Sequence, residues 1–66
     1  MGFKYYGYKY KIFIGSRDIV IKADIDKFDF MVAIADEIIL IVLDEKENEL
    51  YINCKNILCF YVLGYI

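Results

Sequence analysis

The 66-residue sequence predicts a single all-β domain, spanning 1–66, with five or six short antiparallel strands arranged as a meander. Apolar residues make up 61% of the chain, and most are Tyr, Phe, Ile and Val, which suit a pleated, half-buried surface. Apolar and polar residues alternate along several stretches, which are separated by turn-forming or charged clusters. We therefore expect a small barrel or a curved sheet.

The first two alternating stretches predict an antiparallel hairpin. In 8–14 the even-numbered residues form an apolar face, whereas Lys9, Lys11 and Phe13 lie on the opposite face. The segment GSRD at 15–18 has the composition of a turn, because glycine permits positive φ and aspartate bonds to nearby backbone. The second stretch directs its own apolar residues inward, namely Ile19, Ile21, Ala23 and Ile25.

The segment 27–37 fits two structures. Alternation of Phe28, Phe30, Val32 and Ile34 favours a strand. A short helix at about 26–36 is the alternative, with Asp24 or Asp26 as its N-cap and an apolar face formed by Ile25, Phe28, Val32 and Ala35.

The second half of the chain predicts the remaining strands. The segment 38–43 is apolar on both faces, which is typical of a central strand or of a strand covered on both sides. The charged segment 44–49 predicts a hairpin loop, and alternation resumes from residue 50. The run 57–66 has no charged residue, so at an open sheet edge it would invite pairing with another chain.

The surplus of apolar residues predicts self-association. A chain of this size buries only about 60% of its surface and has few interior positions. We therefore expect a homo-oligomer, a dimer or larger, in which a second copy covers apolar surface. The residues expected to mediate this contact lie in the last strand: Phe60, Tyr61, Val62 and Leu63.

The composition disfavours an enzyme, and we expect no cofactor, no metal site and no catalytic residues. The chain has no histidine, and its only serine, Ser16, has no general base beside it. Cys54 and Cys59 are too few for a closed zinc site, and the four glycines form no phosphate-binding loop.

No apolar run reaches the roughly 20 residues of a membrane-spanning helix, and no signal peptide is visible. We therefore expect a cytoplasmic protein with reduced thiols. The abundance of Ile, Lys, Tyr and Asp is typical of AT-rich bacterial or phage genomes.

The function that these observations favour is a non-enzymatic protein-binding module, namely a self-associating regulator, adaptor or inhibitor of a larger intracellular protein. The residues expected to contact a partner are Tyr5, Lys9, Lys11, Phe13 and Arg17 in the first hairpin, and Glu45, Glu47 and Glu49 in the charged loop.

Two other functions remain open. The Tyr/Lys-rich first strand could bind single-stranded nucleic acid, although the net charge of −2 and the placement of Tyr8 and Tyr10 opposite the lysines disfavour this function. A small ligand or nucleotide could bind at a subunit interface, where tyrosine and Arg17 would hold a ring and a phosphate.

Overall fold

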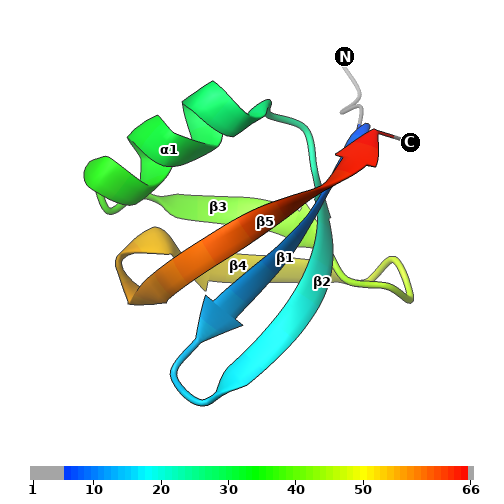
Figure 1. The fold of residues 1–66 in the computed structure, drawn as a ribbon. Helices are drawn as coiled ribbons and strands as arrows, with labels where there is room; N and C mark the ends of the chain where they lie inside the picture. The colour runs from blue at the N-terminus through cyan, green and yellow to red at the C-terminus, as the bar shows by residue number, and fades with distance from the viewer. Residues whose placement is uncertain (1–5, 66) are drawn as a thin grey trace.

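The computed structural model describes residues 6–65, which form one five-stranded antiparallel sheet and one short α-helix (Figure 1). This architecture confirms the predicted fold class. In chain order the elements are β1 (Tyr8–Ile14), β2 (Arg17–Ala23), α1 (Lys27–Ala35), β3 (Ile39–Leu43), β4 (Glu49–Asn53), the 3₁₀ helix η1 (Cys54–Asn56) and β5 (Ile57–Tyr65).

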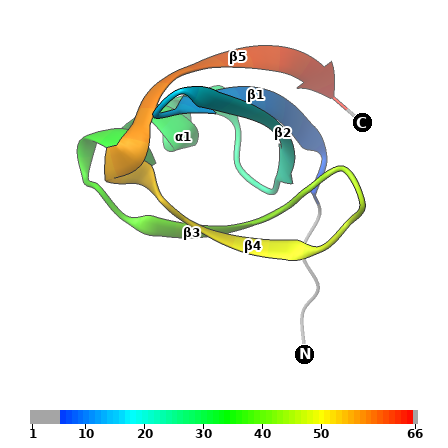
Figure 2. The same cartoon turned by 90° about the horizontal axis from the view of Figure 1, so that it is seen from below.

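The sheet is strongly bent and open, with the strand order β4-β3-β2-β1-β5. β1 and β2 pair along their whole length, from Tyr8↔Ala23 to Ile14↔Arg17, as the predicted hairpin requires. In contrast, β2 meets β3 only at Lys22↔Leu43. The sheet therefore folds over at this junction. Figure 2 shows β5, β1 and β2 on one side of the interior and β3 with β4 on the other.

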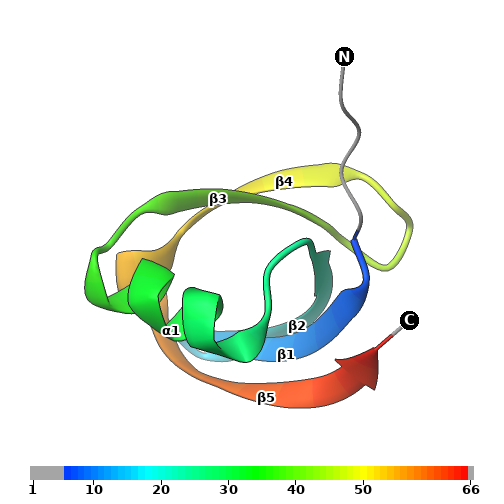
Figure 3. The same ribbon diagram turned by 90° about the horizontal axis from the view of Figure 1, so that it is seen from above.

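The segment 27–37 is a helix, so the favoured interpretation of it as a strand was wrong and the helical alternative was right. Asp26 is the N-cap, and its side chain accepts a hydrogen bond from the Asp29 amide at 2.9 Å. The helix buries Phe30 and Ala33 and leaves Phe28 exposed. In Figure 3 α1 lies over one end of the space between the two layers of the sheet.

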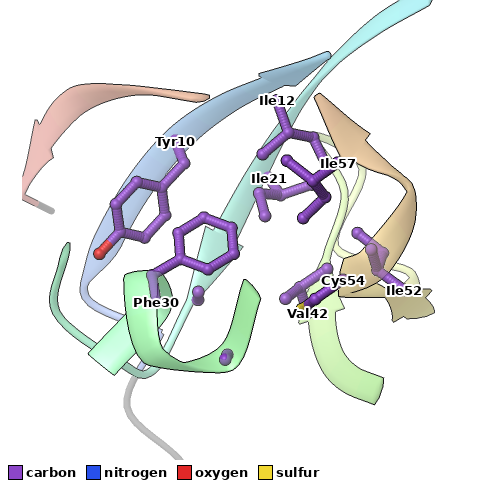
Figure 4. Close-up of a cluster of buried hydrophobic side chains, with 10 residues drawn as sticks. Tyr10, Ile12, Ile21, Phe30, Val42, Ile52, Cys54 and Ile57 are labelled. Carbon is purple, nitrogen blue, oxygen red and sulfur yellow. The ribbon is translucent and has the colours of Figure 1, made fainter. Parts of the chain in front are cut away.

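The core lies between the layers and beneath α1 (Figure 4). Phe30 packs against Tyr10 and Phe60, with ring centroids 4.7 Å apart in both pairs. The Tyr10 hydroxyl donates a hydrogen bond of 2.7 Å to the backbone oxygen of Ile25, which holds the segment leading into α1. The other buried residues are Ile12, Ile21, Ala23, Ala33, Val42, Ile52, Cys54 and Ile57.

The inward-facing residues of the predicted hairpin are confirmed. Tyr10, Ile12, Ile21 and Ala23 are buried. Tyr8, Ile14 and Ile19 pack against the core as well. Ile25 also packs on the core, but it lies after the end of β2, in the segment that leads into the helix.

β3 is a central strand of the sheet, which is the first of the two alternatives predicted for 38–43, and it is not covered on both sides. Val42 is buried and Leu40 packs on the core, but Ile39 is 63% exposed. The strand is interior in the sheet order because β2 and β4 flank it, and no element among residues 6–65 covers its outer face. No helix within residues 6–65 combines the length and apolar character needed to cross a membrane.

We predict that Asp26→Ala lowers the free energy of unfolding by about 1 kcal/mol, because the substitution removes the N-cap of α1. Urea denaturation followed by circular dichroism measures this change. Asp24→Ala is the matched control, since Asp24 is exposed before the helix and a change within about 0.5 kcal/mol is expected there. Equal destabilisation by both variants would contradict the capping role.

Candidate protein-binding groove between α1 and β5

β5 is an edge strand, and it is the longest strand of the sheet. One side of β5 pairs with β1, and the other side pairs with no strand among residues 6–65. No residue from Ile57 to the end of the strand carries a charge. Natural edge strands are commonly protected by charged residues, and β5 has none of these. Its backbone is therefore available for pairing with another chain.

An apolar groove of about 430 Å³ follows this edge. One wall is the last turns of α1, with Met31, Ile34 and Ala35. The other wall is formed by four consecutive residues of β5, 57–60. Because consecutive strand residues point to opposite faces, a groove that touches all four borders the edge of the strand and not a single face. An extended segment in this groove can therefore contact backbone on one side and apolar side chains on the other.

Exposed apolar side chains surround the groove. Leu58 is 70% exposed, and on α1 Phe28, Met31 and Val32 each expose more than half of their surface. A contiguous apolar patch on a small protein usually marks an interaction site. Sequence reasoning missed this part of the surface, because it placed Phe28 and Val32 on the buried side of either a strand or a helix. The signal that favoured the helix was the N-cap candidate Asp26 with an acidic residue in the following turn, and the alternation of apolar residues was wrongly given more weight.

The far half of β5 extends beyond the cover of α1. Val62 pairs with Tyr10 and shares its core-side face, yet Val62 is 43% exposed while Tyr10 is buried. Tyr61 and Leu63 are also exposed. Of the four residues predicted to mediate self-association, these three therefore lie at the surface. Phe60 instead turns toward the core, where it contacts Tyr10 and Phe30.

Two β-bulges interrupt the pairing of β5 with β1. The register skips Leu58 between Ile57 and Cys59, and it skips Leu63 between Val62 and Gly64. Between these bulges the residues 59–62 pair regularly with β1. The regular part of the open edge is therefore the short segment between the two leucines.

The outer face of β1 brings together the predicted residues Lys9, Lys11 and Phe13. β5 adds Tyr61, whose ring meets that of Phe13 edge-to-face at a centroid distance of 5.6 Å. Sequence alternation within one strand could not identify this neighbour. Lys11 forms a salt bridge of 3.2 Å with Asp18, so a carboxylate lies beside this lysine. The remaining predicted residue of this group, Tyr5, lies outside the described residues.

Arg17 does not join this face. It pairs with Ile14 at the end of the hairpin, and with Ile14 and Ile19 it lines a hollow of about 220 Å³. No tyrosine lines this hollow, so the combination of tyrosine and arginine expected for a nucleotide site is not formed there among residues 6–65.

The charged segment forms the turn between β3 and β4, as predicted, except that Glu49 is the first residue of β4. Glu45, Glu47 and Glu49 are all exposed. Glu47 forms a salt bridge of 3.2 Å with Lys22 and adopts positive φ. Asp44 organises the loop by accepting hydrogen bonds from the amides of Lys46 and Asn48. The Asn48 amide, and then its side chain and Lys46, hold the pKa of Asp44 below its usual value near 3.8.

The two cysteines lie in different environments. Cys54 is buried in the core, and burial raises the pKa of its thiol, whereas Cys59 is exposed on β5. In the part of the chain that the structure describes, no three His, Cys, Asp or Glu side chains come together in a way that could hold a metal ion.

Comparison of this chain with protein-family models, curated proteins and solved structures yields no significant match.

We predict that acid weakens the folded state partly through Asp44. When a carboxyl group has a lower pKa in the folded state than in the unfolded state, it stabilises the fold at pH values above its unfolded pKa. This stabilisation is lost as the pH falls through the lower pKa of the folded state. The free energy of unfolding should therefore fall as the pH drops below about 4. Denaturant titrations between pH 2 and pH 7 should show a smaller fall for Asp44→Asn. An identical pH profile for the two proteins would exclude this role.

We also predict that the two thiols react at different rates. Cys59 should be alkylated rapidly at neutral pH, while Cys54 should react only after local or global unfolding, because it is buried and carries less thiolate. Mass spectrometry of peptides after a timed iodoacetamide pulse measures both rates, and urea-unfolded protein serves as the control. Equal labelling rates in the native protein would show that Cys54 is accessible.

Proposed function

We propose that this protein is a small binding module that recognises another polypeptide chain by strand addition in the groove between α1 and β5. In this role it acts as a regulator, adaptor or inhibitor of a larger protein. The observation that carries the proposal is the open, uncharged edge of β5, bordered by an apolar groove on the side away from β1.

Strand addition uses both walls of the groove, the edge of β5 and the apolar side chains of α1. An added strand satisfies the open backbone groups of β5, which supply affinity, while pockets for alternate side chains supply specificity. Alternate residues of the added strand would face Met31, Ile34 and Ala35 on α1. The groove volume lies in the range of protein pockets that accept ligands.

The other candidate functions receive less support from the described residues. The face with Lys9, Lys11 and Phe13 gains an aromatic ring from Tyr61, as a single-strand binder requires. However, Asp18 and Glu47 place carboxylates beside Lys11 and Lys22, which weakens the attraction of this face for phosphates. A hollow of about 570 Å³ beside the β3–β4 loop mixes lysines with carboxylates, so it presents no single charge to a ligand.

We predict that Ala35→Trp blocks partner binding, because the indole fills the groove from an exposed position at the end of α1. The probe is a set of extended peptides selected from a random display library against the wild-type protein. Their affinity should fall at least about tenfold in the variant, as measured by fluorescence anisotropy.

Ile39→Trp is the matched control, since Ile39 is an exposed apolar residue on β3 and does not line the groove. Binding to this variant should remain close to that of the wild type. Backbone amide shifts should locate the bound peptide beside 57–62 and Met31–Ala35. Shifts confined to the β3–β4 loop, or equal affinity of all three proteins, would rule out strand addition at this edge.

A further inference from the structure

The two halves of β5 present complementary surfaces on the same face of the sheet. Near its start, the strand borders the apolar groove through Leu58 and Phe60. In the half of β5 that α1 does not cover, Val62 lies on the core-side face and is partly exposed. One half therefore has an unfilled groove and the other half has an uncovered side chain.

We propose that the groove is filled by β5 of a second copy, which pairs antiparallel to the first through a two-fold axis at the centre of the strand. This inference rests on the proposed function and identifies the added strand. Antiparallel reversal places residue 62 of each copy beside 58–60 of the other. Each Val62 then enters the partner's groove, so the contact is isologous and closes as a dimer.

The face of each side chain limits the register. Residues that lie opposite each other in an antiparallel pair share a face, and Tyr61 and Cys59 lie on the outer face while Phe60 and Val62 lie on the core side. An axis within the regular segment between the bulges therefore passes through Phe60 or through Tyr61. The first register pairs Cys59 with Tyr61 of the second copy. The second register pairs the two Tyr61 residues directly.

The exposed apolar surface is large enough for this dimer. At about 200 Å² for a large apolar residue, the exposed fractions near the groove and on β5 supply on the order of 800 Å² per copy. That is about one partner's share of a standard interface. Antiparallel self-pairing places residues of the same strand close together, and like charges there would repel each other. β5 has no charged residue, so this repulsion does not arise. The contributing residues are Phe28, Met31, Val32, Leu58, Tyr61, Val62 and Leu63.

Sedimentation equilibrium of the wild type and of two edge variants tests the proposal. Wild type should be dimeric, and Tyr61→Asp should raise the dimer dissociation constant at least about tenfold, because it places a charge in the pairing segment. Tyr51→Asp is the matched control, since Tyr51 is an exposed tyrosine on β4, the other edge strand, and its variant should remain dimeric. Ala35→Trp provides a second disruption that leaves β5 unchanged.

Disulfide trapping tests the register. Opposite Cα atoms in an antiparallel pair are about 4.5–5.5 Å apart, within disulfide range. Tyr61→Cys combined with Cys59→Ser should crosslink under mild oxidation if the axis passes through Tyr61. Tyr61→Cys with Cys59 retained should crosslink residue 59 to residue 61 if the axis passes through Phe60. Tyr51→Cys in the Cys59→Ser background should stay uncrosslinked.

The outcomes separate this inference from the proposed function. A dimer that Tyr61→Asp and Ala35→Trp weaken, with crosslinking in one of the two registers, supports both. A monomeric wild type at millimolar concentration overturns the dimer, while peptide binding that Ala35→Trp blocks would still support the module. A dimer that survives both variants, or that gives no crosslink at residue 61, overturns the proposed contact.

Discussion

Phe30 reaches from α1 into the interior and packs between Tyr10 of β1 and Phe60 of β5, and the remaining architecture depends on this contact. The helix has only two fully buried residues, Phe30 and Ala33, and Phe30 is much the larger of the two. Ile34 adds a partly buried contact with the core. The Tyr10 hydroxyl supports the same region from the other side by holding the backbone before the helix. Tyr10 therefore links the sheet, the helix and the approach to the helix.

The same contact determines how much of β5 is covered. Because α1 is short and packs on Phe60, the helix lies beside the first half of β5 and leaves Val62 beyond its reach. The space between α1 and the open edge is the groove, and Phe60 both lines it and packs on Phe30. Among residues 6–65, β5 therefore has an edge that pairs with no other strand, and its Val62 is partly exposed on the core-side face.

The sequence predicted the strands well and predicted the groove poorly, for physical reasons. Alternation identified the buried faces of β1 and β2, because each residue's face depends only on its parity within a strand. The helix was ambiguous because Phe28, Phe30, Val32 and Ile34 fit a strand, and the requirement to cover the open end of a bent sheet is visible only in three dimensions. The meeting of Tyr61 with Phe13 was equally hidden, since it depends on which strands become neighbours.

The pairing of β1 with β5 has a consequence for how the chain reaches this structure. These strands are separated by roughly 40 residues, so bringing them together costs about 3 kcal/mol of loop-closure entropy before any contact offsets it. The β1–β2 hairpin is local and can form early, whereas the other edge of β1 is paired only when β5 joins the sheet. Until β5 joins the sheet, β1 is an edge strand, and it carries Tyr10 and Ile12. Refolding at high protein concentration therefore favours exchange of β5 between chains. Whether the chain folds as a single unexchanged copy depends on how fast β5 pairs with β1 of the same chain.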